Sequence, residues 1–304
     1  MSKFRVISPA TIGNVGPGFD CLGLCLDGLG DRLEGRAASK VMIGAITGRQ
    51  KDKLPTDPTK NSATIAAKYL LEKLGYNGGI EISIHRSLPL SGGLGASASS
   101  AVGGALLAAA LLNREDDKNL ILESALVGET FVAGKHLDNI APCLFGGLTL
   151  VRSLEPIDIV QVPTKVPWWL SVYTPDAELD TKKARTVLDV SLPTQKWVHQ
   201  VAHTSGLVQA FITGDEHLFR KCFDDQFAEP ARASLINHFY SIKKAAMVQG
   251  AMGCSISGGG PSVFAMSSSQ SIALGVSEAM LNAGGGGSVH SGAICLSGAQ
   301  LETV

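Results

Sequence analysis

A glycine- and serine-rich stretch, PLSGGLGASASS, runs from Pro89 to Ser100 and leads into an alanine- and leucine-rich segment. A strand, a glycine loop and a helix in this order aim main-chain N–H groups and the positive end of the helix dipole at one point, which suits a phosphate. Glycine lets the backbone approach such an anion closely. The stretch has no lysine or arginine, so the charge of a triphosphate must be offset by another cation. Mg²⁺ binds hydroxyl, carboxylate and phosphate oxygens, and one loop serine with one acid on a neighbouring helix would hold it.

Two other interpretations of glycine-rich segments have to be weighed. A tight turn ahead of an alanine-rich helix would use the same residue types as this loop. A Walker loop requires G-x-x-x-x-G-K-[ST], and the nearest approach in the chain is GETFVAGKH. There Gly128 and Gly134 are one residue too far apart, and His136 follows the lysine. The Walker interpretation is therefore rejected.

The residues around the loop predict a mixture of strands and helices. In GGIEISIHRSLP the isoleucines at 80, 82 and 84 alternate with polar residues, which is typical of a half-buried strand. GCSISGGGPSVFAMS reads as two strands joined by a glycine turn. Helices are predicted over residues 62–74, 97–112, 118–132, 194–212, 216–227, 232–249 and 270–283. This order indicates an α+β protein.

Length and composition limit the kind of protein. The chain has 304 residues, 45% of them hydrophobic, which favours about two domains. Prolines around residues 151–167 suggest a junction there, with domains at 1–155 and 156–304. A net charge of −1 gives no basic field for nucleic acid or an anionic membrane. No apolar run reaches the ~18 residues of a membrane span. Six scattered cysteines without a CxxC pair or a secretory signal indicate reduced thiols and a cytoplasmic location.

Three motifs in order resemble those of the GHMP kinases, the family that includes galactokinase, homoserine kinase, mevalonate kinase and phosphomevalonate kinase. They are PLSGGLGASAS, PATIGNVGPGFDCLG (9–23) and GCSISGGGPSVFA (253–265). Within the family, NVGPGFDCLG, HLDNIAPCLFGG (136–147) and AEPAR (228–232) resemble the homoserine kinases. The resemblance implies a two-domain GHMP kinase fold, with a ribosomal protein S5 domain 2-like N-terminal domain and a ferredoxin-like C-terminal domain.

The resemblance also implies an activity. It is the ATP- and Mg²⁺-dependent phosphorylation of L-homoserine to O-phospho-L-homoserine, a step of threonine biosynthesis, by an enzyme that is commonly a homodimer. Two alternatives stay open. One is another small-molecule GHMP kinase that acts on mevalonate or a sugar. The other is a catalytically silent ligand-binding protein on the same scaffold.

Site residues follow from the same resemblance. Homoserine is a zwitterion with a primary hydroxyl, so its binding needs a cationic fork, an acceptor for the ammonium and a group that aligns the hydroxyl. The resemblance assigns the substrate to Asp20, His136, Arg185 and Arg232, with Asn14 and Asn139 as the catalytic pair. It assigns Mg²⁺ to Ser97 and Glu129. It assigns ATP to Pro89, Leu90, Ser91, Gly92, Gly93, Leu94, Gly95, Ala96, Ser97, Ala98, Ser99, Asn61 and Arg86.

The proton acceptor is not evident from the sequence. Asn139 stands where mevalonate kinase-like members present an aspartate, and an amide cannot take a proton. Asp138 is adjacent, but neighbouring side chains usually point apart. A loose phosphoryl-transfer transition state asks little of a base. We therefore expect the hydroxyl proton to reach a γ-phosphate oxygen, directly or through water, with Asn139 orienting the nucleophile.

Some residues depart from the family pattern. Ala96 replaces a serine of the loop, Gly259 replaces a serine of the C-terminal motif, and Thr11-Ile12-Gly13 differs before Asn14. None removes an expected metal ligand, so activity should survive. His199 and His203 lie four apart in HQVAH, but the zincin pattern requires glutamate at Gln200. They are read as histidines on a helix face.

Overall fold

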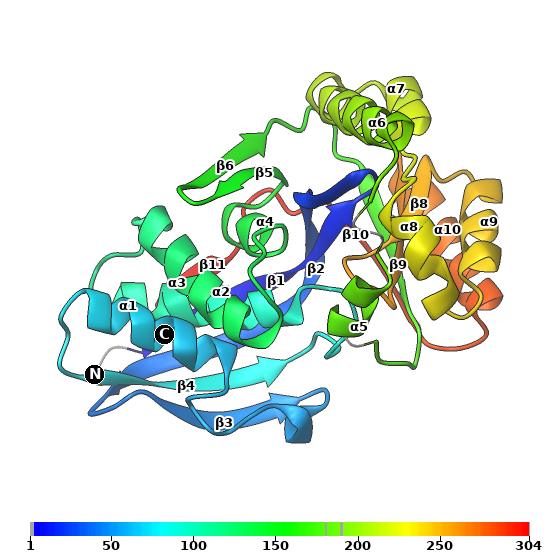
Figure 1. The fold of residues 1–304 in the computed structure, drawn as a ribbon. Coiled ribbons are helices and arrows are strands. Elements are labelled where there is room, and N and C mark those ends of the chain that lie inside the picture. The colour runs from blue at the N-terminus through cyan, green and yellow to red at the C-terminus, as the bar shows by residue number, and fades with distance from the viewer. Residues whose placement is uncertain (1–2, 180, 189–190, 304) are drawn as a thin grey trace.

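The computed structural model describes residues 3–179, 181–188 and 191–303, and two β-sheets form its framework (Figure 1). The larger sheet has seven strands in the order β11-β1-β2-β4-β3, with β5 paired to β2 and β6 paired to β5. Its strands are β1 (Lys3–Val15), β2 (Gly18–Ala38), β3 (Met42–Gly48), β4 (Gly79–Arg86), β5 (Leu148–Leu154), β6 (Ile157–Val162) and β11 (Gln300–Thr303). The smaller sheet has the order β10-β7-β9-β8. Its strands are β7 (Trp169–Thr174), β8 (Gly253–Ile256), β9 (Val263–Ser267) and β10 (Ser288–Ala293).

Helices cover both sheets. On the larger sheet, α2 (Ala96–Leu111) packs on β1 and β2, and α1 (Ser62–Lys73) and α3 (Lys118–Val132) pack on α2. On the smaller sheet lie α9 (Phe239–Val248) and α10 (Gln270–Gly284), while α6 (Thr194–Thr213) pairs with α7 (Glu216–Cys222). The remaining short helices are α4 (Ile140–Phe145), α5 (Thr181–Thr186), α8 (Ala228–Arg232) and the 3₁₀ turns Lys51–Lys53 and Ala233–Leu235. The predicted α+β class is confirmed.

Most predicted helices end within two residues of the observed ones, and two do not. The helix predicted over 216–227 ends at Cys222, and the five residues after it form a connection. Of the helix predicted over 232–249, Arg232 is the last residue of α8, Ala233–Leu235 form a 3₁₀ turn, and α9 begins only at Phe239. His238 has a φ of 60° directly before α9, and a left-handed residue cannot continue a right-handed helix.

The N-terminal motif forms a β-hairpin. β1 runs through Val15 and pairs antiparallel with β2, so that Gly13 lies opposite Gly23 and Val15 opposite Gly18. The tight turn at Gly16 and Pro17 therefore projects from the end of two long paired strands. This pairing carries the motif out to the region between the two sheets.

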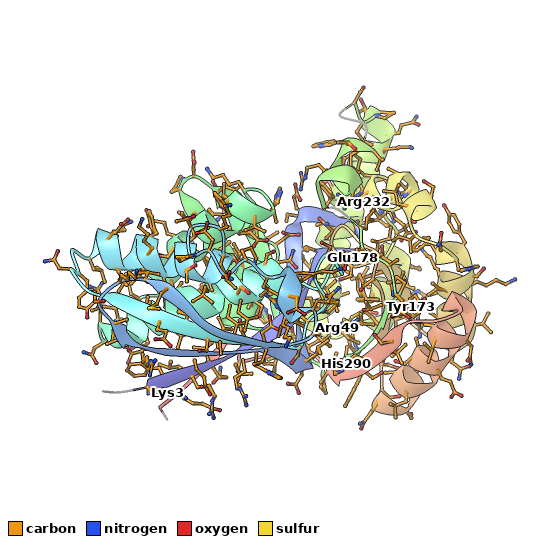
Figure 2. All side chains as sticks on the ribbon, turned by 90° about the horizontal axis from the view of Figure 1, so that it is seen from below. Lys3, Arg49, Tyr173, Glu178, Arg232 and His290 are labelled. Carbon is orange, nitrogen blue, oxygen red and sulfur yellow. The ribbon has the colours of Figure 1, made fainter. Side chains whose placement is uncertain are left out.

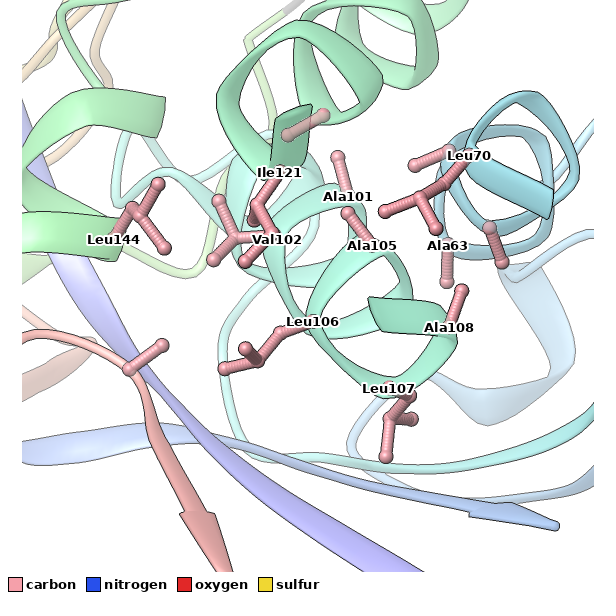
Figure 3. Packing of buried hydrophobic residues seen from close by; sticks show 14 of the residues in the cluster. Ala63, Leu70, Ala101, Val102, Ala105, Leu106, Leu107, Ala108, Ile121 and Leu144 are labelled. Atoms are coloured by element: carbon pink, nitrogen blue, oxygen red, sulfur yellow. The ribbon is translucent and has the colours of Figure 1, made fainter. Parts of the chain in front are cut away.

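Helix α2 is fixed by close packing of small residues (Figure 3). Ala101, Ala105 and Ala108 are fully buried. Gly104 approaches α1 so closely that a Cβ on it would lie 2.1 Å from the carbonyl oxygen of Ala63. Because protein interiors pack as densely as crystals, the alanine-rich pattern holds α2 rigidly, and with it the glycine loop at its N-terminus.

The larger sheet takes strands from both sides of the predicted 155/156 boundary. β6 pairs with β5, and β11 returns from the end of the chain to pair with β1. The four antiparallel strands and two helices of the smaller sheet match the ferredoxin-like expectation. Among the described residues, no helix is long and apolar enough to cross a membrane.

Candidate active site

The three motifs meet in one cleft between the sheets. The N–H of Gly258 donates to the carbonyl of Gly13 at 3.0 Å, and the hydroxyl of Ser257 donates to the carbonyl of Gly93 at 2.6 Å. The N–H of Ser262 donates to the carbonyl of Gly92 at 3.2 Å. Segments that lie far apart in the sequence thus enclose a cleft of about 420 Å³.

The glycine loop forms one wall of this cleft, at the start of α2. The wall residues from the loop are Leu90, Ser91, Gly92, Gly93, Gly95, Ala96 and Ser97. The other predicted nucleotide residues of the loop, Pro89, Leu94, Ala98 and Ser99, do not line the cleft. Ser99 is fully buried and its hydroxyl donates to the carbonyl of Ser8 at 3.1 Å. The loop therefore presents main-chain groups and the Ser97 hydroxyl to the cleft, at the positive end of the α2 dipole.

Arg86 lies beneath the loop as its structural support. Its guanidinium pairs with the fully buried Asp31 at 2.6 Å and donates to the carbonyl of Ala96 at 2.9 Å and to the hydroxyl of Ser100 at 2.8 Å. The other oxygen of Asp31 accepts the N–H groups of Ser87 and Leu88. The loop itself contains no cation, but the guanidinium of Arg86 lies beneath it and is paired with Asp31. The sequence analysis did not identify Asp31. A direct contact of Arg86 with the nucleotide base stays a prediction.

Ser97 and Glu129 lie together at the loop end of the cleft. The Ser97 hydroxyl donates to Glu129 Oε1 at 2.8 Å. Glu129 is 6% exposed, and its Oε2 is buried without a hydrogen-bond partner among the described residues. Burial, with the nearby charge of Asp138, raises the pKa of Glu129 to about 7. A buried carboxylate oxygen without a partner beside a serine hydroxyl fits a hard divalent cation such as Mg²⁺.

Asn61 lines the same cleft and caps α1. Its Oδ1 accepts the N–H of Ala63 at 3.1 Å, and its Nδ2 donates to the carbonyl of Pro55 at 3.0 Å. Both ends of the amide therefore hold the local backbone. Contact with a nucleotide remains a prediction for this residue.

Opposite charges gather at the other end of the cleft. Arg185 donates to the two carboxylate oxygens of Asp20 at 3.0 and 2.8 Å. Arg185 also lies 3.3 Å from Nδ1 of His136, and burial and the charge of Arg185 lower the pKa of that histidine. Arg232 is buried near the junction of the two β-sheets (Figure 2). There its guanidinium donates to the carbonyls of Ala184 and Gly258. The structure thus brings together all four residues predicted to bind the substrate.

Asn14 connects this charged end to the middle of the cleft. Its Oδ1 accepts the N–H of Asp20 at 2.8 Å, and its Nδ2 donates to the carbonyl of Gly258 at 2.9 Å. Its own N–H donates to Oδ2 of Asp138 at 3.2 Å. Asn14 has a φ of 56°, a conformation that asparagine tolerates better than most residues. These contacts join the turn of the N-terminal hairpin to the glycine turn at Gly258, after β8.

Asp138 and Asn139 line the same cleft, so the expectation that their side chains point apart is wrong. Nδ2 of Asn139 lies 3.4 Å from Oδ1 of Asp138, and Oδ1 of Asn139 accepts the hydroxyl of Thr11 at 2.9 Å. A Cβ on Gly13 would lie 2.3 Å from Oδ2 of Asp138 and 2.5 Å from Nδ2 of Asn139. The Thr11-Ile12-Gly13 departure therefore has a structural reason: threonine orients Asn139, and glycine leaves room for both side chains.

His199 and His203 lie outside this cleft, on α6. The structure brings Oδ2 of Asp224 to 3.0 Å from Nε2 of His199, and Nδ1 of His203 contacts the carbonyl of His199. Over the described parts of the chain, these three residues form the one group with the donor types and spacing of a metal site. Sequence reasoning missed Asp224 because it follows the end of α7.

Comparisons with known proteins agree with this geometry. The family models described as "GHMP kinases N terminal domain" and "GHMP kinases C terminal" match residues 61–147 and 207–287. A homoserine kinase of Chlorobium phaeobacteroides (strain BS1) is 38% identical over 93% of this chain and 92% of its own length. A homoserine kinase of Arabidopsis thaliana is 37% identical over 92% of this chain and 78% of its own length.

Solved structures agree as well. The crystal structure of homoserine kinase from Cytophaga hutchinsonii superposes with a TM-score of 0.94 at 38% identity, covering 99% of this chain and 97% of that one. A mevalonate kinase from L. major, in complex with R-mevalonate, has a TM-score of 0.72 at 16% identity over 95% of this chain and 94% of its own, which shows the shared fold alone. The chain therefore belongs to the GHMP kinases and, within them, to the homoserine kinase family.

Proposed function

We propose that the protein transfers the γ-phosphoryl group of ATP to the hydroxyl of L-homoserine, which yields ADP and O-phospho-L-homoserine. One observation carries this proposal: a single cleft is lined both by the glycine loop at the start of α2 and by a cluster of opposite charges. The relatives named homoserine kinase support it. The product would serve threonine biosynthesis, as the name of those relatives implies.

The loop end would hold the nucleotide. Main-chain N–H groups of residues 92–97 and the α2 dipole bind the phosphates, and Arg86 keeps the loop in shape from below. Ser97 and Glu129 would hold Mg²⁺, which offsets the charge of the phosphates when it is bound. Glu129 must then be ionised, and the cation itself favours that state.

The charged end suits a zwitterion. Arg185 and Asp20 neutralise each other in the structure. An α-amino acid can insert its carboxylate between Arg185 and Arg232 and its ammonium against Asp20, so that each charge exchanges one partner for another. Arginine forks match carboxylates in two-point geometry. The cost of separating the pair is thereby offset by the two charges of the ligand.

The alternative substrates lack one or both of these charges. Mevalonate has a carboxylate but no ammonium, so it would leave Asp20 without a partner when Arg185 turns to the ligand. A sugar offers neither charge. When an analogue leaves a buried polar group of the site unpaired, the site discriminates strongly against that analogue. A silent binding protein would have no use for the Ser97–Glu129 pair beside the loop.

The test is an ADP-release assay with identification of the product. Homoserine, mevalonate, galactose, serine and threonine are compared at equal concentration with ATP and Mg²⁺. The proposal expects homoserine to be the best substrate and O-phosphohomoserine to be the product. ADP release that is fastest with mevalonate or galactose would contradict it, and ATP binding without turnover of any alcohol would support the silent binder.

A homodimer and a cytoplasmic location stay proposals that come from the resemblance and from the cysteine pattern. Light scattering on the purified protein would test the first: a mass of about twice the 31.7 kDa of the chain is expected.

A further inference from the structure

His199, His203 and Asp224 come together where α6 meets the residues that follow α7. The two histidines lie one turn apart on α6, and their rings are stacked with centroids 3.6 Å apart. Asp224 is the second residue after α7, which ends at Cys222. One possible ligand atom of each residue lies within 4.8 Å of those of the other two. None of the three is among the residues that line the cleft, so this group is separate from the proposed nucleotide and Mg²⁺ site.

The imidazole of His199 has a nitrogen that its neighbours leave unused. Its Nε2 is buried and has no hydrogen-bond partner among the described residues, although Oδ2 of Asp224 lies 3.0 Å from it. At that distance an N–H aimed at the oxygen would form a hydrogen bond, so the oxygen lies to one side of the N–H direction. Two ligands of one ion show such an offset, because each is aimed at the ion and not at the other ligand. On a tetrahedral ion with bonds of about 2.0 Å, two ligands lie about 3.3 Å apart.

The second histidine is held in the form that binds a metal ion. Nδ1 of His203 lies 2.9 Å from the carbonyl oxygen of His199. A carbonyl oxygen only accepts, so Nδ1 carries the hydrogen and Nε2 of the neutral ring keeps its lone pair. Metal-binding histidines are commonly oriented by a hydrogen bond of this kind, and ligating carboxylates are hydrogen-bonded in turn. Oδ2 of Asp224 accepts Nε2 of Gln226 at 3.4 Å.

From this arrangement we infer that His199, His203 and Asp224 bind one divalent transition-metal ion, Zn²⁺ or a neighbour of similar chemistry. Two neutral imidazoles and one carboxylate are donors that such ions prefer, whereas Mg²⁺ and Ca²⁺ prefer oxygen ligands. The side chain of Asp224 is 54% exposed, so an ion can enter from solvent and keep a water molecule as a further ligand.

The ion ties α6 to the segment that begins α8. Gln200 follows His199 and donates to the carbonyl of Pro17 and to Oδ1 of Asp225. Asp225 follows Asp224 and accepts main-chain N–H groups at the start of α8. The neighbours of two ligands thus already hold α6, the N-terminal hairpin and α8 together, and the ion adds to this connection. Because Gln200 offers an amide where the zincin pattern has its glutamate, the ion stabilises the fold and does not catalyse hydrolysis.

The experiment measures Zn²⁺ binding to the full chain by isothermal titration calorimetry, after chelation and dialysis, in excess Mg²⁺ and without nucleotide or alcohol. We expect one ion per chain with a Kd of about 10 µM or lower, and a Tm that rises by about 2 °C or more at saturating Zn²⁺. His203→Gln and Asp224→Asn should each weaken binding at least about tenfold. His217→Gln is the matched control and should bind like the wild type, because His217 is an exposed histidine of α7 outside the group.

X-ray absorption spectroscopy of the Zn²⁺-bound wild type identifies the ligands even if a variant fails to fold. Nitrogen and oxygen at about 2.0 Å with imidazole scattering are expected, and a sulfur ligand at about 2.3 Å would overturn the inference, because a cysteine would then hold the ion. Absence of binding in excess Mg²⁺, wild-type affinity in His203→Gln, or equal losses in His203→Gln and His217→Gln would overturn it as well. None of these measurements uses a substrate, so the site can be present even if the proposed function is wrong, and the reverse.

Discussion

Arg185 and Asp20 form a two-point ion pair, with Nη1 and Nη2 of the arginine 3.0 and 2.8 Å from the two carboxylate oxygens. The pair joins α5 to the hairpin of the N-terminal motif, two segments 165 residues apart. It places opposite charges side by side at the point where a zwitterion is proposed to bind. The proposed specificity for a zwitterionic substrate depends on this pair.

Arg185→Gln should therefore weaken substrate binding more than it slows the chemical step. A hydrogen bond to a charged group contributes about 1.5–3 kcal/mol, so KM for homoserine should rise roughly 10- to 100-fold. Nucleotide affinity, measured by titration with an ATP analogue, should stay the same. Arg152→Gln is the matched control, because Arg152 pairs with Asp158 on the exposed surface. Equal effects of the two substitutions would contradict the assignment.

Glu129→Gln tests the metal pair at the loop. Loss of one anionic ligand should lower kcat by about 10²-fold or more, and should raise the Mg²⁺ concentration that gives half-maximal activity. Glu123→Gln on the same helix is the control, because Glu123 bonds to Tyr69 and Lys73 instead. The assignment of Glu129 would be wrong if both variants showed the wild-type response to Mg²⁺.

A residue of this site could be predicted from the sequence only where a local pattern indicates the direction of its side chain. The alternation that buries Ile80, Ile82 and Ile84 continues to Arg86, so its inward direction could have been predicted from the period of the strand. Its partner Asp31 could not, because their meeting depends on the register between β2 and β4, in which Arg32 lies opposite His85. That register is a tertiary property.

The expectation that the side chains of Asp138 and Asn139 point apart was wrong for a different physical reason. Neighbouring side chains point apart in an extended strand, but Asn139 is the N-cap of α4, with φ −103° and ψ −38°. Side chains that follow each other at a helix start are separated by about 100° around the axis, so both can face one cleft. The helix at 140–145 contains a proline and only six residues, which left no periodic pattern to reveal it.

The Arg86–Asp31 pair gives a prediction about stability. Arg86→Met leaves the buried Asp31 charge uncompensated, which should lower the free energy of unfolding by about 3–5 kcal/mol. Arg36→Met removes an exposed pair with Glu81 on the neighbouring strand and should cost less than about 1 kcal/mol. Urea unfolding of the two variants measures both values. Similar midpoints would mean that the buried pair does not stabilise the fold more than the exposed pair.

The raised pKa values of Asp138 and Glu129 predict how stability depends on pH. A carboxyl whose pKa is higher in the folded state stabilises the fold while it is protonated, and this contribution is lost as the pH rises through the folded value. Both groups titrate at about 7 in the folded protein. The Tm of the ligand-free protein should therefore fall between about pH 4 and pH 7, and should fall less in Asp138→Asn. Thermal unfolding of both proteins across that range measures the difference. An identical pH dependence would show that Asp138 is not held at a raised pKa.

The most direct test of the central claim follows the phosphorus itself. ³¹P NMR of a mixture of the protein, ATP, Mg²⁺ and homoserine should show a phosphomonoester signal growing in step with ADP, and the signal should be absent when homoserine is omitted or the dication is chelated. ADP accompanied only by inorganic phosphate, or a phosphomonoester that forms equally well without Mg²⁺, would contradict a cleft that uses its glycine loop and Glu129 to phosphorylate a bound amino acid.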